Sequence, residues 1–233
     1  MNSGAKTSNS PWALPTINHS MNFSEALTTT WKFFSEGGIF MLFLALCSLV
    51  AITVIIMKFL SLKREQILPP HLESEVENFE EHLEKGTLAE LQTEFERGEN
   101  ALARLCTVAI SNAGRTQGEV QEAVQSSARE EIVRMNSGLP VLDVIITIAP
   151  LLGLLGTTSG LMTVFGDLDD KDTISRGIAV ALSTTIVGLA IAVPAVIAQS
   201  YFTRRIETMA ARLEVLLGKV VSACHQHVFF RDK

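Results

Sequence analysis

The stretch APLLGLLGTTSGLMTVF, Ala149 to Phe165, decides the fold of this chain. It contains no charged residue, yet glycines and hydroxyl side chains interrupt its middle. Glycine costs about 1 kcal/mol relative to alanine in a water-exposed helix, so a soluble helix gains nothing from such a pattern. In a membrane, small residues let two helix backbones approach closely, and hydroxyls then bond across the gap. The stretch therefore predicts a transmembrane helix that packs tightly on another helix.

Three blocks of the 233-residue chain are long and apolar: residues 37–57, 144–165 and 178–198. Each reaches the roughly 20 residues that a helix needs to cross about 30 Å of hydrocarbon. The net charge of -6 does not favour nucleic-acid binding. Composition thus predicts an all-α membrane protein with three transmembrane helices and long cytoplasmic helical extensions.

Basic residues near the ends of these blocks predict the orientation in the membrane. They follow the first block, precede the second and follow the third, whereas the link GDLDDKDTISRG between the second and third is acidic. The N-terminus is therefore expected outside and the C-terminus in the cytoplasm. The expected segments are an outer tail at 1–36, transmembrane helices at 37–57, 139–165 and 177–203, a cytoplasmic helical domain at 58–138, an outer loop at 166–176, and a cytoplasmic C-terminal helix and tail at 204–233.

Helical stripes recur in the segments outside the membrane. An amphipathic helix is expected within residues 22–34, on the outer surface of the membrane. After Pro69-Pro70, a further helix is expected to place apolar residues on one face, with breaks at Gly86-Thr87 and Arg97-Gly98. Another is expected from about Glu119 to Met135, continuing toward the second span. The stripe residues are Leu72, Val76, Phe79 and Leu83 in the cytoplasmic domain, and Ile206, Met209, Leu213, Leu216 and Leu217 after the third span. Since such segments are not expected to form a separate globule, the stripes indicate packing between copies of the chain.

Small residues form one continuous face of the third block, with Thr185 near its middle. The face consists of Gly177, Ala181, Thr185, Gly188, Ala192 and Ala195, at steps of three or four, and the second block offers Gly153, Gly156, Thr157 and Gly160. Two interpretations fit this pattern. Either the two faces pack together as ordinary neighbouring helices, or they line a central space that another helix or water fills.

The stretches LPVLDVIITIAPLLGLLGTTSGLMTVF and GIAVALSTTIVGLAIAVPAVIAQSYFTRR resemble the MotA/TolQ/ExbB proton-channel family, with the three-span ExbB/TolQ branch the most similar. The family signatures are APLLGLLGTV.G in the second span and GIAEAL..T..GL..A.PA in the third. The resemblance covers about residues 139–205, and IIMKFLSLKREQILP after the first span also fits. Both signatures occur here in the family's order with a short link between them.

The resemblance implies an energy transducer of the bacterial inner membrane with a periplasmic N-terminus. It implies a homopentamer whose second and third spans surround a single-span partner of the ExbD/TolR type, with a titrating aspartate on the partner. The family's two pore threonines fall on Thr157 and Thr185, and their neighbours Thr184 and Ser159 are further candidates for the ion pathway. Candidates for pore-helix packing are Gly153, Gly156, Gly160, Ala181, Gly188 and Pro194.

One position departs from the family pattern. The family glutamate before the Ala181-Leu182 pair is Val180 here, so either ions take another route or the chain is a non-conducting scaffold. Asp143, at the cytoplasmic end of the second span, is a candidate substitute, and a solvated surface carboxylate is the alternative interpretation. Sodium use is a further alternative, because hydroxyl and carbonyl oxygens suit that ion as well.

Nothing in the sequence favours an enzyme or a cofactor. It shows no phosphate loop, catalytic triad or cofactor fingerprint. His225 and His227 lack a third metal ligand nearby, so we expect them to be solvated. The expected partners are copies of the same chain, the single-span protein and the lipid bilayer.

Overall fold

The computed structural model describes residues 38–85, 88–166 and 171–231, and every regular element within these ranges is an α-helix. The predicted amphipathic helix at 22–34 and the predicted break at Gly86-Thr87 lie outside the described residues. The helices are α2 (Gly38–Ser61), α3 (Arg64–Ile67), α4 (Pro70–Glu77), α5 (Phe79–Lys85), α6 (Leu88–Glu96), α7 (Ala101–Ser111), α8 (Gln117–Asn136), α9 (Leu139–Gly166) and α10 (Lys171–Arg231).

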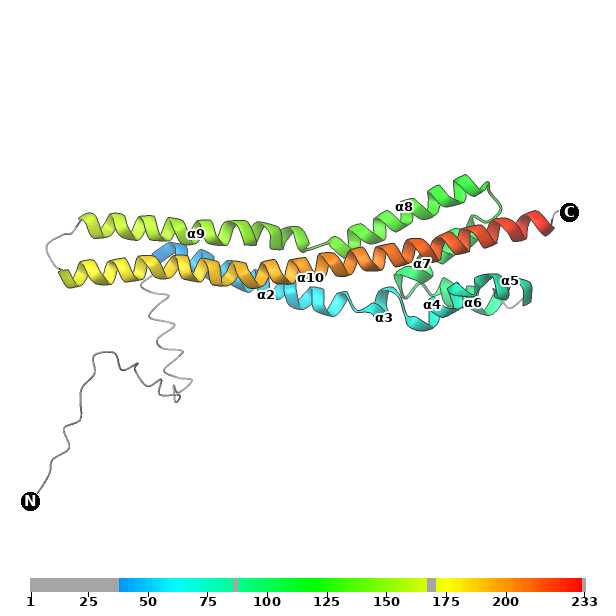
Figure 1. The fold of residues 1–233 in the computed structure, drawn as a ribbon, viewed down its shortest axis with the longest axis horizontal. Coiled ribbons are helices and arrows are strands. Elements are labelled where there is room, and N and C mark those ends of the chain that lie inside the picture. Colours follow the sequence, from blue (N-terminus) through cyan, green and yellow to red (C-terminus); the bar gives the residue numbers. More distant parts are fainter. Residues whose placement is uncertain (1–37, 86–87, 167–170, 232–233) are drawn as a thin grey trace, which may run out of the picture.

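The molecule is a long rod organised around α10, which runs along its whole length (Figure 1). Helices α2 and α9 accompany one half of α10, and α3 to α8 accompany the other half (Figure 1). Among the described residues, three helical stretches are long and apolar enough to cross a membrane: α2, the stretch from α8 to Met162 in α9, and α10 from Gly177 to His225. The predicted fold class, an all-α membrane protein, is confirmed.

Helix α10 is continuous across both of its predicted boundaries. The loop expected at 166–176 is much shorter, because α9 extends to Gly166 and α10 begins at Lys171. At the other end the same helix passes through Arg204 without a break and continues to Arg231. Loss of hydrophobicity marks where a helix leaves the hydrocarbon, but it does not end the helix unless a breaker follows.

Helices α8 and α9 are separate, whereas the sequence predicted that α8 would continue toward the second span. The chain turns at Gly138, whose φ of 85° is in the left-handed region that glycine adopts without strain. Pro140 then falls in the first turn of α9, where its missing N–H breaks no helical hydrogen bond. The ammonium of Lys58 at the end of α2 donates to the carbonyl of Met135, 2.8 Å away, and so ties α2 to the last turn of α8.

Helices α3 to α8 and the part of α10 beside them, which we call the polar half of the rod, form a hydrophobic core within one chain. We expected the stripes of this segment to pack between copies, and the structure corrects this expectation. Leu72, Val76 and Phe79 are buried together with the α10 stripe from Ile206 to Leu217. The cause is the length of α10, which carries its apolar face past α4, α7 and α8. The predicted helix after Pro69-Pro70 is two helices, because the chain turns at Asn78 between α4 and α5. The predicted break near Gly98 is confirmed between α6 and α7.

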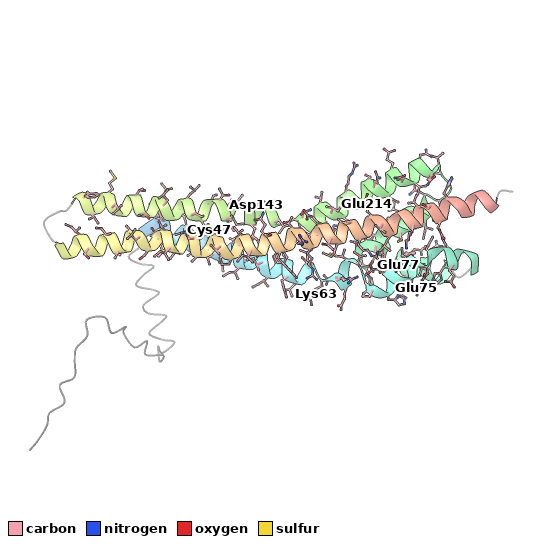
Figure 2. All side chains as sticks on the ribbon, in the orientation of Figure 1. Cys47, Lys63, Glu75, Glu77, Asp143 and Glu214 are labelled. Carbon is pink, nitrogen blue, oxygen red and sulfur yellow. The ribbon has the colours of Figure 1, made fainter. Side chains whose placement is uncertain are left out.

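A smaller core lies in the membrane half, where Met41, Leu44 and Ala51 of α2 pack on Ile145 and Ala149 of α9. Most of the charged residues labelled in Figure 2 lie outside this membrane half. Glu75, Glu77 and Glu214 lie in the polar half, whereas Asp143 lies near the end of α9 that adjoins α8 (Figure 2). The surface where α9 and α10 meet lies in the membrane half of the rod.

Candidate functional site

Helices α9 and α10 approach so closely that no side chain fits at the glycines between them. A Cβ at Gly153 would lie 2.9 Å from the carbonyl oxygen of Thr184, and one at Gly188 would lie 2.6 Å from that of Ala149. Gly156 and Gly160 face Thr184 and Ala181, with would-be Cβ distances of 2.7 and 2.8 Å. Backbone this close is the condition under which short hydroxyl side chains can reach across a helix interface.

Three threonines use this proximity. The hydroxyls of Thr157 on α9 and Thr185 on α10 form a hydrogen bond with each other. Thr185 and Thr184 both reach the carbonyl oxygen of Gly153, at 3.1 and 3.0 Å. Thr157 and Thr184 both reach the carbonyl oxygen of Ala181, at 3.2 and 2.7 Å. We call Thr157, Thr184, Thr185 and these two carbonyls the threonine cluster.

Proton counting shows that the cluster has more than one arrangement. Each hydroxyl donates one hydrogen and accepts others, and each carbonyl only accepts. If Thr157 donates to Thr185, then Thr185 donates to Gly153 and Thr184 to Ala181. If Thr185 donates to Thr157 instead, then Thr157 donates to a carbonyl, because that of Gly153 is also within 3.0 Å. The cluster can therefore reverse the direction of its hydrogen bonds without a change in backbone.

The cluster is partly exposed. Thr184 is buried, with 2% of its surface exposed, whereas Thr157 and Thr185 are half-buried. Lone pairs of these two hydroxyls are therefore within reach of a group outside the chain, such as water or a partner side chain. Such a group meets a surface that offers hydroxyls but no charge.

The remaining predicted residues lie apart from the cluster. Ser159 follows Thr157 by about 200° around α9 and is exposed. Pro194 lies inside α10, about two and a half turns beyond Thr185, and is exposed. Without an N–H, it leaves the carbonyl of Ala190 without its usual helical donor. Val180 is half-buried and offers no polar atom.

Asp143 has a partner that sequence reasoning missed. The Asp143 carboxylate accepts a hydrogen bond from the side-chain amide of Gln199 on α10. The two residues lie 56 positions apart, and the only available signal was a polar residue near the end of each span. Among the described residues, no group of three histidine, cysteine, aspartate or glutamate side chains is arranged to hold a metal ion.

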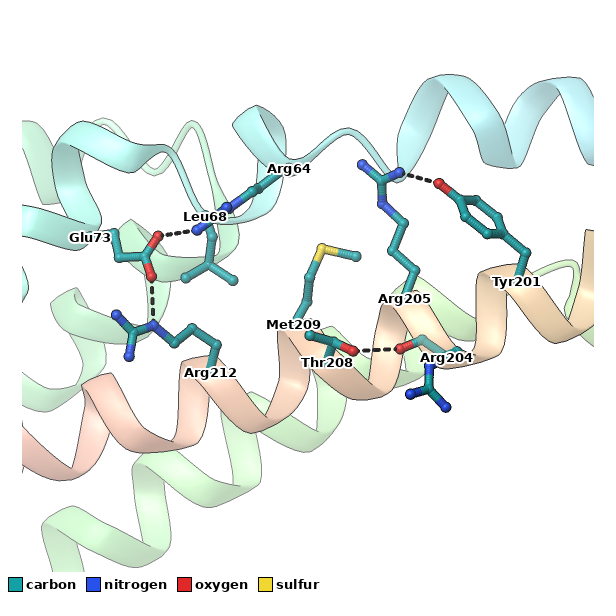
Figure 3. Close-up of a pocket in the computed structure, with 9 residues that line it drawn as sticks. All are labelled: Arg64, Leu68, Glu73, Tyr201, Arg204, Arg205, Thr208, Met209 and Arg212. Atoms are coloured by element: carbon teal, nitrogen blue, oxygen red, sulfur yellow. Dashed lines mark hydrogen bonds and ion pairs between the residues drawn. The ribbon is translucent and has the colours of Figure 1, made fainter.

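Sequence reasoning also missed a second polar region, which lies in the polar half next to the transmembrane helices. Arginines of α3 and α10 gather there around a cavity with Glu73 on its wall (Figure 3). Arg64, Arg204, Arg205 and Arg212 are among the basic residues that predict the orientation, and nothing local in the sequence shows that α3 and α10 lie together.

A profile of the MotA/TolQ/ExbB proton channel family matches residues 62–215, more than half of the chain. The chain belongs to this family. Among its relatives is a putative biopolymer transport protein ExbB homolog of Methanothermobacter thermautotrophicus, 30% identical over 192 residues, or 81% of this chain and 68% of the relative. The Tol-Pal system protein TolQ of Pseudomonas aeruginosa is 31% identical over 118 residues, or 48% of this chain and 51% of the relative.

These names, together with the biopolymer transport protein exbB1 of Vibrio cholerae, place the chain in the ExbB/TolQ branch. The Vibrio protein is 32% identical over 139 residues, or 57% of this chain and 61% of the relative. The chain is thus a multi-pass membrane protein of a family of energy-transducing stators. The matched residues 62–215 include the whole threonine cluster.

Proposed function

We propose that this ExbB/TolQ-type chain is the channel-forming subunit of a proton-driven stator in the bacterial inner membrane, with its N-terminus in the periplasm. In this proposal five copies surround a single-span partner of the ExbD/TolR type. The partner carries an aspartate that takes up and releases protons, and this cycle drives work in the cell envelope. Thr157, Thr185 and Thr184 line the ion pathway, and Ser159 belongs to the same stretch of α9.

The observation that carries the proposal is the half-buried threonine cluster, which lies between two transmembrane helices whose apolar stretches contain no charged residue. From Val144 to Phe165 and from Gly177 to Thr203, the sequence has no Asp, Glu, Lys, Arg or His. A proton that crosses the whole membrane potential releases about 2.3 kcal/mol per 100 mV, so a group partway across the membrane must bind and release it. The titrating group therefore belongs to another molecule, and hydroxyls that can reverse their hydrogen bonds suit a carboxylate that alternates between charged and neutral.

Exposed apolar side chains on α9 and α10 support assembly into an oligomer. Leu151 and Leu155 on α9, and Leu182, Ile186 and Leu189 on α10, are all between 49% and 66% exposed in the single chain. Lipid or another protein must cover such a surface. Copies arranged in a ring would cover part of it and leave the threonine cluster facing the centre.

A non-conducting scaffold is the second candidate function, and Val180 favours it. A carboxylate at this position belongs to the pattern that the chain resembles, and valine cannot carry a proton. In that case the small faces serve packing alone. Asp143, held by Gln199 at the cytoplasmic end, would then be a surface carboxylate rather than a route for protons.

The test begins with native mass spectrometry of the tagged chain, extracted from its own host in mild detergent with co-purifying proteins. The stator proposal expects five copies with two of a small single-span protein that bears a membrane aspartate. The co-purified complex is then placed in liposomes, and proton and sodium flux are measured under an imposed potential. Thr157→Val and Thr185→Val are expected to abolish flux while the complex keeps its mass.

The outcomes separate the candidates. Loss of flux in both valine variants, with assembly intact, supports the channel. An intact complex that conducts neither ion supports the scaffold, and flux of sodium alone replaces the proton as the coupling ion. A monomer or dimer in the first step rules out a pore built from several copies.

A further inference from the structure

A cavity of about 500 Å³ opens where α3 and α4 meet α10 (Figure 3). Four arginines line it: Arg64 of α3, and Arg204, Arg205 and Arg212 of α10. Its apolar wall comes from Leu68, Met209 and the ring of Tyr201. The cavity therefore combines a basic rim with an apolar interior, and we call it the arginine pocket.

The charge of the pocket is only partly balanced. Glu73, which is 7% exposed, accepts a 2.8 Å bond from Arg64 and a 2.5 Å bond from Arg212, and Arg212 also pairs with Glu77. The hydrogen bond from Arg212 is the main cause that holds the pKa of Glu73 below its ordinary value. Glu73 is thus ionised at neutral pH, and it fixes Arg64 and Arg212 in the wall of the pocket.

The charges of Arg204 and Arg205 are not balanced in this way by acidic side chains of the described residues. Within the described part of the chain, neither guanidinium makes an ion pair. Arg205 donates instead to the hydroxyl of Tyr201, 2.7 Å away, and its guanidinium carbon lies 5.9 Å from the centre of that ring. Two positive charges therefore border the cavity without an acidic partner, which is the arrangement of a site for an anion.

The pocket lies where the apolar helices leave the hydrocarbon. Helix α2 ends at Ser61, three residues before Arg64, and the apolar run of α10 ends just before Tyr201. Tyrosine at such a boundary is typical of a membrane interface. The exposed side chains of Phe59 and Leu60 precede α3, with 65% and 54% of their surfaces accessible, so apolar surface adjoins the basic rim.

We propose that the arginine pocket binds the phosphodiester headgroup of an anionic phospholipid, with Arg205 on the phosphate and Leu68 and Met209 beside the glycerol. Arg204, whose guanidinium points to the other side of α10, adds positive charge at the edge of the pocket (Figure 3). A planar guanidinium matches phosphate with two parallel hydrogen bonds, and basic pockets beside spans on the cytoplasmic side suit lipid headgroups. The bound lipid joins α3, which follows the first span, to the cytoplasmic extension of the third. The proposal requires a membrane-spanning chain and does not depend on ion conduction.

The experiment measures binding of two soluble short-chain lipids to the full-length purified protein. Dihexanoyl phosphatidylglycerol is anionic, dihexanoyl phosphatidylcholine is zwitterionic, and inorganic phosphate tests whether the lipid body matters. Adducts are counted by native mass spectrometry, and affinities are measured by titration below the critical micelle concentrations. We expect the protein to bind the anionic lipid at least about thirtyfold more tightly than the zwitterionic one, as two arginines predict.

Matched variants locate the site. R204Q/R205Q is expected to lose the preference for the anionic lipid. R204K/R205K is expected to keep part of it, because lysine retains the positive charge but lacks the planar guanidinium that forms two parallel hydrogen bonds. The control R115Q/R129Q removes the same charge from exposed positions outside the pocket and is expected to bind as the parent does. If R204Q/R205Q fails to fold, as seen by circular dichroism, the comparison of R204K/R205K with the control decides.

Three results would overturn the proposal. One is equal binding of the two lipids by the parent protein. Another is a loss in R115Q/R129Q as large as that in the pocket variant, which would mean that net charge alone attracts lipid. The third is inorganic phosphate binding as tightly as the anionic lipid, which would make the pocket a site for a soluble phosphate compound.

Discussion

Thr157 of α9 and Thr185 of α10 join the two helices through a hydrogen bond between their hydroxyls, and both also reach the carbonyl of Gly153. The contact exists because Gly153 has no side chain to keep the helices apart. The same contact therefore packs α9 against α10 and brings their hydroxyl groups together. A substitution can change the hydroxyl without changing the packing, or the packing without changing the hydroxyl, and this separates the two roles.

Thr185→Val removes the hydroxyl and keeps the branched shape. We expect ion flux in the reconstituted complex to be lost, because the cluster no longer connects Thr157 to its exposed part. The thermal stability of the complex is expected to change little, since one hydrogen bond between membrane helices contributes about 0.6 kcal/mol.

Two variants control this prediction. Thr185→Ser restores a hydroxyl and is expected to restore flux. Ser183→Ala removes a hydroxyl that donates along its own helix, to the carbonyl of Ala179 at 2.7 Å, and is expected to leave flux intact. Equal flux in the valine and serine variants of Thr185 would remove the cluster from the ion pathway.

Gly188→Ala tests the packing alone. Its Cβ would lie 2.6 Å from the carbonyl oxygen of Ala149, which is backbone and cannot turn aside. We expect a loss of stability of about 1 to 3 kcal/mol, measured as a lower melting temperature in detergent, because the helices must separate.

Gly218→Ala is the matched control on the same helix. Nothing lies within 4 Å of its would-be Cβ, so alanine gains up to about 1 kcal/mol in helix propensity. A Gly188→Ala protein as stable as this control would show that α9 and α10 are not as close as described.

The sequence was sufficient to predict the spans and the threonine pair, because both depend on local composition and on helical period. Thr157 and Thr185 lie on small-residue faces, and close helices bring such faces together. The same period could not show that Thr184 turns into the interface with them, since that depends on the rotation of α10 about its axis. Thr184 and Thr185 are adjacent, yet both bond to Gly153.

The polar half was less predictable. Its stripe residues Leu72, Val76 and Phe79 are buried as predicted, and the side chain of Leu83 lies outside the described part of the chain. The predicted partner of the stripes was wrong, because a stripe shows which face is buried and not what covers it. The Arg212 to Glu73 contact joins residues 139 positions apart, and no local pattern encodes such a distance. The turn at Gly138 was missed because a single glycine is also tolerated inside helices.

Cysteine reactivity tests the core of the polar half. Burial, and to a smaller degree the neighbouring Cys224, raises the pKa of the Cys106 thiol, and burial raises that of Cys224 to about 11. At pH near 7.5 both stay protonated, so a soluble maleimide is expected to label neither in the folded protein and both after denaturation. Adding Ser137→Cys, at an exposed position, supplies a site that must react, and rapid labelling of Cys106 would contradict the packed core.

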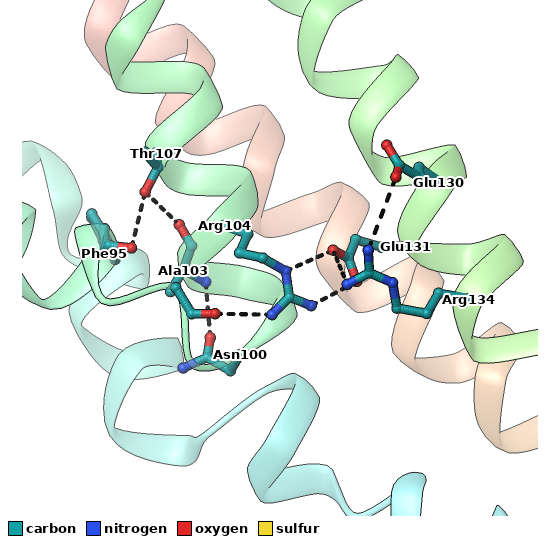
Figure 4. A network of polar contacts seen from close by, with 9 residues as sticks. Phe95, Asn100, Ala103, Arg104, Thr107, Glu130, Glu131 and Arg134 are labelled. Atoms are coloured by element: carbon teal, nitrogen blue, oxygen red, sulfur yellow. Dashed lines mark hydrogen bonds and ion pairs between the residues drawn. The ribbon is translucent and has the colours of Figure 1, made fainter.

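Acidification tests the ion pair between α7 and α8, where both oxygens of the Glu131 carboxylate accept bonds from Arg104 at 2.7 Å (Figure 4). Hydrogen bonding by Arg104 lowers the pKa of Glu131 from its ordinary 4.5, so the unfolded chain binds more protons than the folded chain near that pH. The contribution of the pair is therefore complete above pH 4.5 and is lost as the pH falls through the folded pKa.

We expect the melting temperature in detergent to fall between about pH 5 and pH 3, and to fall less steeply in Glu131→Gln. That variant is also expected to be less stable at neutral pH by about 1 to 2 kcal/mol, a modest loss because solvent reaches part of Arg104. Glu130→Gln changes an adjacent carboxylate whose side chain is 78% exposed, and its pH profile is expected to match that of the parent. Parallel profiles for the parent and Glu131→Gln would mean that the pair does not hold α7 to α8.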